Sequence, residues 1–274
     1  MRFFFRCRPA CAALLATLAL GTSALANPPA ASVYLEDLTS PEVRQWIAAG
    51  PTTVLIPIGG TEQNGPHMVL GKHNTRARVL AGEIARTLGH TLVAPVVAYV
   101  PEGAINPPAA HMRYAGTLSI PEATFESLLE ATARSLKQHG VRDVVLLGDH
   151  GGYQRSETRV ADKLNREWAR DPRCRVHALL AYYQVTQAAY VDDLRQRGFT
   201  TAQIGTHAGL ADTALAMAVD PSLVRPDAHA LLARDKAGVS GDPTAATVAL
   251  GHLGVMRIVE TAVAAIREAT RAPR

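Results

Sequence analysis

Residues 56–74 read I-P-I-G-G-T-E-Q-N-G-P-H-M-V-L-G-K-H-N. The apolar run that leads into them predicts a buried strand over Thr52 to Ile58, because it lacks the alternation of a half-exposed strand. Two glycines end that strand, and Gly65, Pro66 and Gly71 exclude regular structure beyond it. The next regular element is a helix expected over Asn74 to Leu88. This strand, loop and helix set the pattern for the rest of the chain.

Strand-like and helix-like segments alternate after this point. Three further strands are expected over Thr91 to Val97, Asp143 to Leu147 and Arg175 to Tyr183. Amphipathic or apolar helices are expected between and after them, at 121–139, from 153 to about 170, up to 219, and from 243 to 270. Strands that alternate with helices and carry continuous apolar runs are typical of a parallel sheet covered on both faces. The sequence therefore predicts an α/β fold, a three-layer α/β/α sandwich with a mostly parallel sheet.

The loop after the first strand is crowded with polar side chains, which is typical of ligand sites in α/β proteins. It resembles the signature E-x-H-G-P-H-L-P-L-x-T-D of the creatininase family, creatinine amidohydrolase and its relatives. The positions that match are Glu62, Gly65, Pro66, His67 and Leu70. Two positions depart from it: Asn64 stands where the resemblance implies a metal-binding His, and His73 where it implies an Asp that bridges two metals.

Later segments extend the resemblance to about Leu38 to Ile266. Residues 111–119, H-M-R-Y-A-G-T-L-S, are similar to the family's H-x-x-F-P-G-T-L-S, and His150 in G-D-H-G-G matches the metal-binding His of N-G-H-G-G-N. His207 and Asp212 lie in a segment similar to G-x-H-A-G-x-x-E-T-S, with Asp in place of Glu. The resemblance implies the creatininase fold and a homo-oligomer, commonly a hexamer.

A metal site is expected where the strands end, since the carboxyl ends of parallel strands lie along one edge of a sheet. The predicted ligands are Glu62, His73 and His150, with Asp212 as a fourth ligand, directly or through water. Two His and one Glu leave one position of a catalytic zinc open to water. An imidazole cannot bridge two ions as a carboxylate does, and the amide of Asn64 is a weak ligand. We therefore expect one divalent ion per chain, zinc or, as the alternative, manganese.

The predicted catalytic residues are Glu62 and His207. The resemblance implies that His207 lies near the scissile bond, where an imidazole can move a proton near neutral pH. The function expected is a metal-dependent amidohydrolase that cleaves a non-peptide amide, including cyclic ones, with a metal-activated water. Two alternatives stay open, an exported metal-dependent lactonase or esterase and a non-catalytic protein that binds a metal or small molecule.

Residues 1–26 have the features of a secretory signal peptide: three arginines, an apolar run over 10–20 and the cleavage motif A-L-A at 24–26. Residues 27–274 are then a single creatininase-like domain. Removing the leader lowers the formal net charge from +4 to about +1, so the composition gives no support for nucleic-acid binding. One cysteine, Cys174, is left, so no internal disulfide is expected. The mature form is expected in the periplasm, without membrane contact, acting on a small molecule.

Cleavage after Ala26 is the first testable prediction. Protein recovered from the periplasm should have Asn27 as its first residue when its intact mass is measured. Uncleaved chain found only in the cytoplasm would contradict this assignment.

Overall fold

The computed structural model describes Met1 and residues 32–271 apart from position 236, and the predicted signal peptide lies outside these residues. Four parallel strands form one sheet in the order β2-β1-β3-β4, which confirms the predicted parallel α/β fold. The strands are β1 (Thr53–Ile58), β2 (Thr91–Val93), β3 (Asp143–Gly148) and β4 (Arg175–Ala178). The longest pairing joins β1 to β3 over six residues, from Thr53 opposite Asp143 to Ile58 opposite Gly148.

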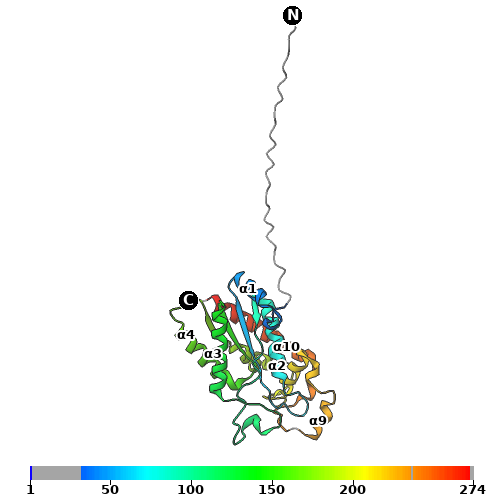
Figure 1. Ribbon diagram of the computed structural model, residues 1–274. Helices are drawn as coiled ribbons and strands as arrows, with labels where there is room; N and C mark the ends of the chain where they lie inside the picture. Colours follow the sequence, from blue (N-terminus) through cyan, green and yellow to red (C-terminus); the bar gives the residue numbers. More distant parts are fainter. Residues whose placement is uncertain (2–31, 236, 272–274) are drawn as a thin grey trace. The chain divides into compact units, whose positions relative to one another are not determined.

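Helices cover both faces of the sheet (Figure 1). Side chains of β1 alternate between two apolar cores: Val54, Ile56 and Ile58 enter the core on one face, and Leu55 enters the core on the other. The first face is covered by α3 (Glu122–Gln138) and α4 (Gln154–Glu167), with α1 (Ser40–Ala48) at its margin. The second is covered by α2 (Lys72–Leu88), α5 (Ala181–Gln187), α6 (Ala189–Gln196), α7 (Thr201–Ile204), α8 (Leu210–Val219) and α10 (Val248–Arg271).

Several short helices complete the fold. They are α9 (Ala228–Arg234) and the 3-10 helices η1 (Leu35–Asp37), η2 (Ala110–Arg113), η3 (Gly151–Tyr153), η4 (Pro221–Leu223) and η5 (Pro243–Ala245). The predicted strands over 91–97 and 175–183 were too long: β2 ends at Val93, and β4 ends at Ala178 before α5 begins. Their early ends leave the chain free to form loops around the edge of the sheet.

The strand order places a crevice beside β1. The chain runs from β1 to β2 on one side and later adds β3 on the other side of β1. The connections that leave the carboxyl ends of the neighbouring strands β1 and β3 therefore run in opposite directions. The space between the starts of two such loops is where open parallel sheets bind ligands. The loop after β1 carries Glu62, and the loop after β3 carries Asp149 and His150.

Helix α2 begins two residues earlier than predicted, at Lys72, directly after Gly71. Lys72 and His73 therefore belong to its first turn instead of the loop. Residues three or four apart lie on the same side of a helix, so Arg76 shares a face with both. All three side chains are buried.

Helix α10 is long and apolar enough to cross a membrane by length and composition alone. In this fold α10 buries one side, with Ile258, Ala262, Val263 and Ile266, in the core that it shares with α2, α5 and α8. Packing thus accounts for the apolar residues on this side of the helix.

A carboxyl group is buried beneath the end of β3. Glu157 of α4 is 1% exposed, and neither side-chain oxygen has a hydrogen-bond partner among the described residues. A Cβ on Gly148 would lie only 1.9 Å from Oε1 of Glu157. The strand can therefore come this close to α4 only because residue 148 is glycine. Burial raises the pKa of Glu157 from 4.5 to about 8.

This buried acid should make folding stability fall as pH rises. Between pH 4.5 and about 8 the unfolded chain ionises Glu157 while the folded chain keeps its proton, so ionisation favours unfolding. The slope contributed is up to about 1.4 kcal/mol per pH unit. Urea unfolding at pH 5 and pH 8 should show Glu157→Gln losing less stability than wild type over this range. An identical pH dependence in the two proteins would show that Glu157 is ionised in the fold.

Candidate metal centre

Four side chains converge at the carboxyl edge of the sheet. One ligand atom each of Glu62, Glu102, His111 and His150 lies within 4.8 Å of the others. Glu62 follows β1 and His150 follows β3, whereas Glu102 and His111 come from the long connection between β2 and α3. Glu62 and Glu102 are buried, and the two histidines are partly exposed at the mouth of the site.

The loop after β1 holds Glu62 in place through its own backbone. The backbone N–H of Glu62 donates to the carbonyl of Leu70 at 3.1 Å, and the Asn64 side-chain amide donates to the carbonyls of Glu62 and Val69. Gly60 has a φ of 152°, and a Cβ there would lie 2.5 Å from Oε1 of Glu102. A glycine therefore lets the two carboxylates approach each other.

Three buried oxygens of this cluster lack a hydrogen bond among the described residues, although Nε2 of His111 lies 3.2 Å from one of them, Oε2 of Glu62. Oε2 of Glu62 and both side-chain oxygens of Glu102 have no hydrogen bond within the described part of the chain. Burial, followed by the charge of Glu62, raises the pKa of Glu102 to about 8. Carboxylate oxygens beside imidazoles are a donor set suited to zinc or manganese. The residues present therefore fit a divalent ion, which would neutralise the two carboxylates.

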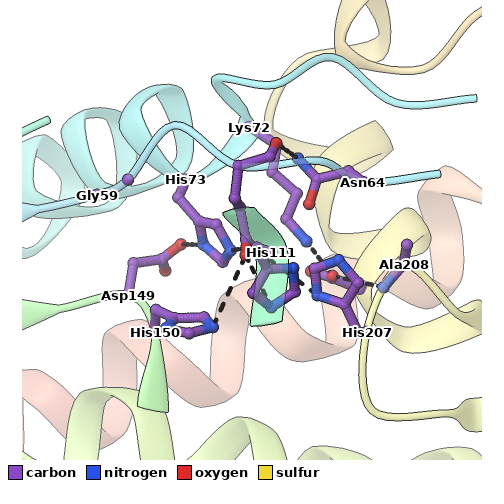
Figure 2. A network of polar contacts seen from close by, with 12 residues as sticks. Gly59, Asn64, Lys72, His73, His111, Asp149, His150, His207 and Ala208 are labelled. Carbon is purple, nitrogen blue, oxygen red and sulfur yellow. Dashed lines mark hydrogen bonds and ion pairs between the residues drawn. The ribbon is translucent and has the colours of Figure 1, made fainter. Parts of the chain in front are cut away.

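The other oxygen of Glu62 faces a histidine. His73 lies between two carboxylates, with Nε2 at 2.8 Å from Oε1 of Glu62 and Nδ1 at 2.6 Å from Oδ2 of Asp149 (Figure 2). Burial alone would lower the pKa of His73, but the hydrogen bonds to Asp149 and Glu62 outweigh it and the pKa is raised. Burial likewise opposes ionisation of Glu62, yet His73 and Lys72 hold its pKa well below the usual range.

Two further cations from α2 lie behind His73. Lys72, 1% exposed, forms a short ion pair with Oδ2 of Asp212, the acid at the start of α8. Nε of Arg76 donates to Asp149 at 2.8 Å, and its NH1 donates to Oδ1 of Asp212 at 2.8 Å. The three α2 cations therefore bind the carboxylates that follow β3 and begin α8.

His207 reaches the site from the loop before α8. Its backbone pairs with Ser240 through two hydrogen bonds of 2.8 and 3.3 Å, and its Nδ1 lies 3.8 Å from Oε1 of Glu62. Nε2 of His207 lies 2.9 Å from the backbone oxygen of Gln63 and 3.0 Å from the side-chain Nε2 of Gln63. The same side-chain nitrogen of Gln63 lies 3.1 Å from Nδ1 of His111. Burial and then the charge of Lys72 lower the pKa of His207 to about 4, so its ring is neutral at neutral pH.

Of the four predicted metal ligands, Glu62 and His150 lie in the cluster. His73 and Asp212 lie beside it with their polar atoms paired as described, and a ligand role for them stays a prediction. The predicted catalytic residues Glu62 and His207 face each other. Asp149, the residue before His150, contacts His73. His67 lies outside the cluster, where its Nε2 forms a hydrogen bond of 3.0 Å with Oγ1 of Thr213.

Sequence reasoning missed Glu102 and His111 as site residues. The signal for these two was the length of the connection over 94–121, because long loops in compact domains are commonly functional. Burial of Lys72 follows from the earlier start of α2, which the pattern of residues did not show.

Comparison with known proteins matches this chain to one family. The creatininase family model, described as creatinine amidohydrolase, matches residues 36–268. Creatinine amidohydrolase of Pseudomonas putida is 29% identical over 72% of this chain and 75% of its own length. Mycofactocin precursor peptide peptidase of Mycolicibacterium smegmatis is 27% identical over 73% of this chain and 78% of its own length. A solved structure titled Creatininase Mn superposes with a TM-score of 0.72 and 25% identity, covering 88% of this chain and all of that one.

Members of this family are metal-dependent hydrolases that act on amide bonds. The family model spans most of the chain, and the fold superposes on a solved structure of the family. The loops after β1 and β3, with the connection between β2 and α3, hold the carboxylates and imidazoles of a candidate metal site. On these grounds the chain belongs to the creatininase family.

Proposed function

We propose that this protein is a metal-dependent amidohydrolase that cleaves the C–N bond of a small non-peptide amide. One observation carries the proposal: three buried carboxylate oxygens, on Glu62 and Glu102, have no hydrogen bond among the described residues and lie together with two imidazoles, with Nε2 of His111 at 3.2 Å from Oε2 of Glu62. A divalent ion would pair with these oxygens and hold both carboxyl groups ionised, which burial opposes at Glu102. We further propose that the enzyme acts in the periplasm, after removal of residues 1–26, as a homo-oligomer.

The residues around the cluster have distinct parts in such a reaction. Glu62, Glu102 and His150, with His111 at the mouth, would hold the ion, which supplies Lewis acidity and lowers the pKa of water toward ~7. His207 is neutral at neutral pH, so it must first accept a proton before it can donate one to a leaving nitrogen. Its contacts with Gln63 keep Nδ1 turned toward Glu62.

The space beside the cluster supports a small substrate. A cavity of about 60 Å³ lies between His150 and His207 and is bordered by α5, α6 and α8. Tyr183 borders it without a hydrogen bond on its hydroxyl among the described contacts, and Thr206 adds a second hydroxyl group. Such walls suit a compact polar amide. The peptidases among the relatives make short peptides a necessary comparison in any assay.

Removing one carboxylate charge should weaken metal binding. Glu102→Gln keeps the shape of the side chain but removes the anion that the ion would neutralise. We expect its divalent metal affinity to fall by more than the roughly 10–100-fold that losing an outer-shell partner costs. Titration of the metal-free protein against a competing chelator measures this. His150→Ala should abolish tight binding while circular dichroism shows a folded protein.

The matched control is Glu157→Gln, which alters a carboxyl group that is equally buried but lies outside the cluster. Its metal affinity should equal that of wild type. If Glu102→Gln also binds like wild type, the ion does not sit between Glu62 and Glu102.

Catalysis should separate the three candidate functions. The zinc- or manganese-loaded protein is assayed on cyclic amides, linear non-peptide amides, dipeptides and lactones. We expect amide hydrolysis that a chelator abolishes, and a loss of about 10²–10⁴-fold in His207→Ala, the usual contribution of general acid–base catalysis. Ester hydrolysis should fall less, because an alkoxide leaves with less help from a proton donor.

The control for this assay is His252→Ala, on the exposed side of α10. Turnover of lactones alone would favour the lactonase alternative. Tight metal binding without turnover of any compound would favour the non-catalytic alternative.

A further inference from the structure

The carboxylates around the site fall into two sets with opposite surroundings. Oε2 of Glu62 and both oxygens of Glu102 have no hydrogen bond among the described residues, as stated above. All four oxygens of Asp149 and Asp212 accept from donors on other residues. The donors to Asp149 are Arg76, His73 and the hydroxyl of Tyr182, and the donors to Asp212 are Arg76, Lys72 and the backbone N–H of Ala208.

We propose that Lys72 and Arg76 form a built-in cation set that takes the place of a second metal ion at Asp149 and Asp212. The chain would then bind one divalent ion, at the Glu62–Glu102 cluster, and keep the adjoining carboxylates neutralised with side chains.

The helix supplies the geometry of this cation set. Lys72, His73 and Arg76 lie within one turn and a fraction of α2, so their side chains project into the same part of the site. Figure 2 shows Lys72 pointing from α2 into the site toward His207, and His73 pointing toward Asp149. Each cation is at most 4% exposed, so solvent cannot substitute for its carboxylate partner.

The ammonium of Lys72 affects most of the site. It contributes to lowering the pKa of His67, His150 and His207, in each case after burial itself. A fixed positive charge at the centre of a metal site disfavours a further cation nearby, since like charges at contact distance repel strongly in a buried setting. This repulsion supports the assignment that rests on the contacts.

The test replaces Lys72 with an apolar side chain of similar length in the mature, full-length protein. Lys72→Met leaves Asp212 with Arg76 as its one side-chain cation, and opens space beside it. Zinc and manganese are titrated into the metal-free protein, with bound metal counted by elemental analysis and thermal unfolding followed in parallel.

Wild type should bind one ion tightly. Lys72→Met should bind a second ion at least about tenfold more tightly than wild type does, since a unit charge at contact distance is worth more than that at an effective dielectric constant of ~20. Its melting temperature should be lowered without metal and should recover as metal is added. Lys163→Met, which removes an exposed lysine paired with Glu130, should behave as wild type.

A double variant keeps the test decisive if Lys72→Met does not fold. Lys72→Met with Asp212→Asn removes both charges, so it should fold, bind one ion and show no added stabilisation by a second. The proposal fails if wild type holds two tight ions, if folded Lys72→Met gains no second ion, or if the double variant also fails to fold. None of these outcomes depends on which amide the enzyme cleaves.

Discussion

Glu62 is a fully buried carboxylate, and the arrangement around it follows from the need to compensate its charge. An unpaired buried charge costs several kcal/mol, so each of its oxygens requires a positive partner. One oxygen is served by His73 at 2.8 Å. The other oxygen has no hydrogen bond within the described part of the chain and lies 3.2 Å from Nε2 of His111 and 4.0 Å from Nε2 of His150, beside Glu102, which is where a divalent ion fits.

Other parts of the fold are arranged around this requirement. The parallel pairing of β1 with β3 sets the loops that bear Glu62 and His150 side by side. Helix α2 begins at Lys72 and thereby delivers its cations to Asp149 and Asp212. Asp212 in turn accepts from the backbone of Ala208, a residue with a φ of 54°, and so ties the His207 loop to α2. Loss of one charge should therefore be felt at His207 as well as at the metal.

The fold was predictable from the sequence because apolar runs and glycine or proline breaks are local signals, and the family motifs fixed the loops after β1 and β3. Those motifs are why Glu62 and His150, which lie in the cluster, were singled out from the sequence. Glu102 was not, since one acid in a proline-rich loop of 94–121 carries no pattern that brings it to Glu62. The burial of Lys72 depends on where α2 starts and on its ion pair with Asp212, 140 residues later. A contact between residues so far apart in the chain leaves no local sequence pattern. His73 was recognised as unusual, but its position between two carboxylates needed the structure.

The most direct test of this account is a crystal structure of the metal-loaded protein with anomalous scattering measured at the zinc or manganese edge. The account predicts a single strong peak per chain, bounded by Glu62, Glu102 and His150, with Lys72 still paired to Asp212. A second peak between Asp149 and Asp212, with Lys72 displaced, would contradict it.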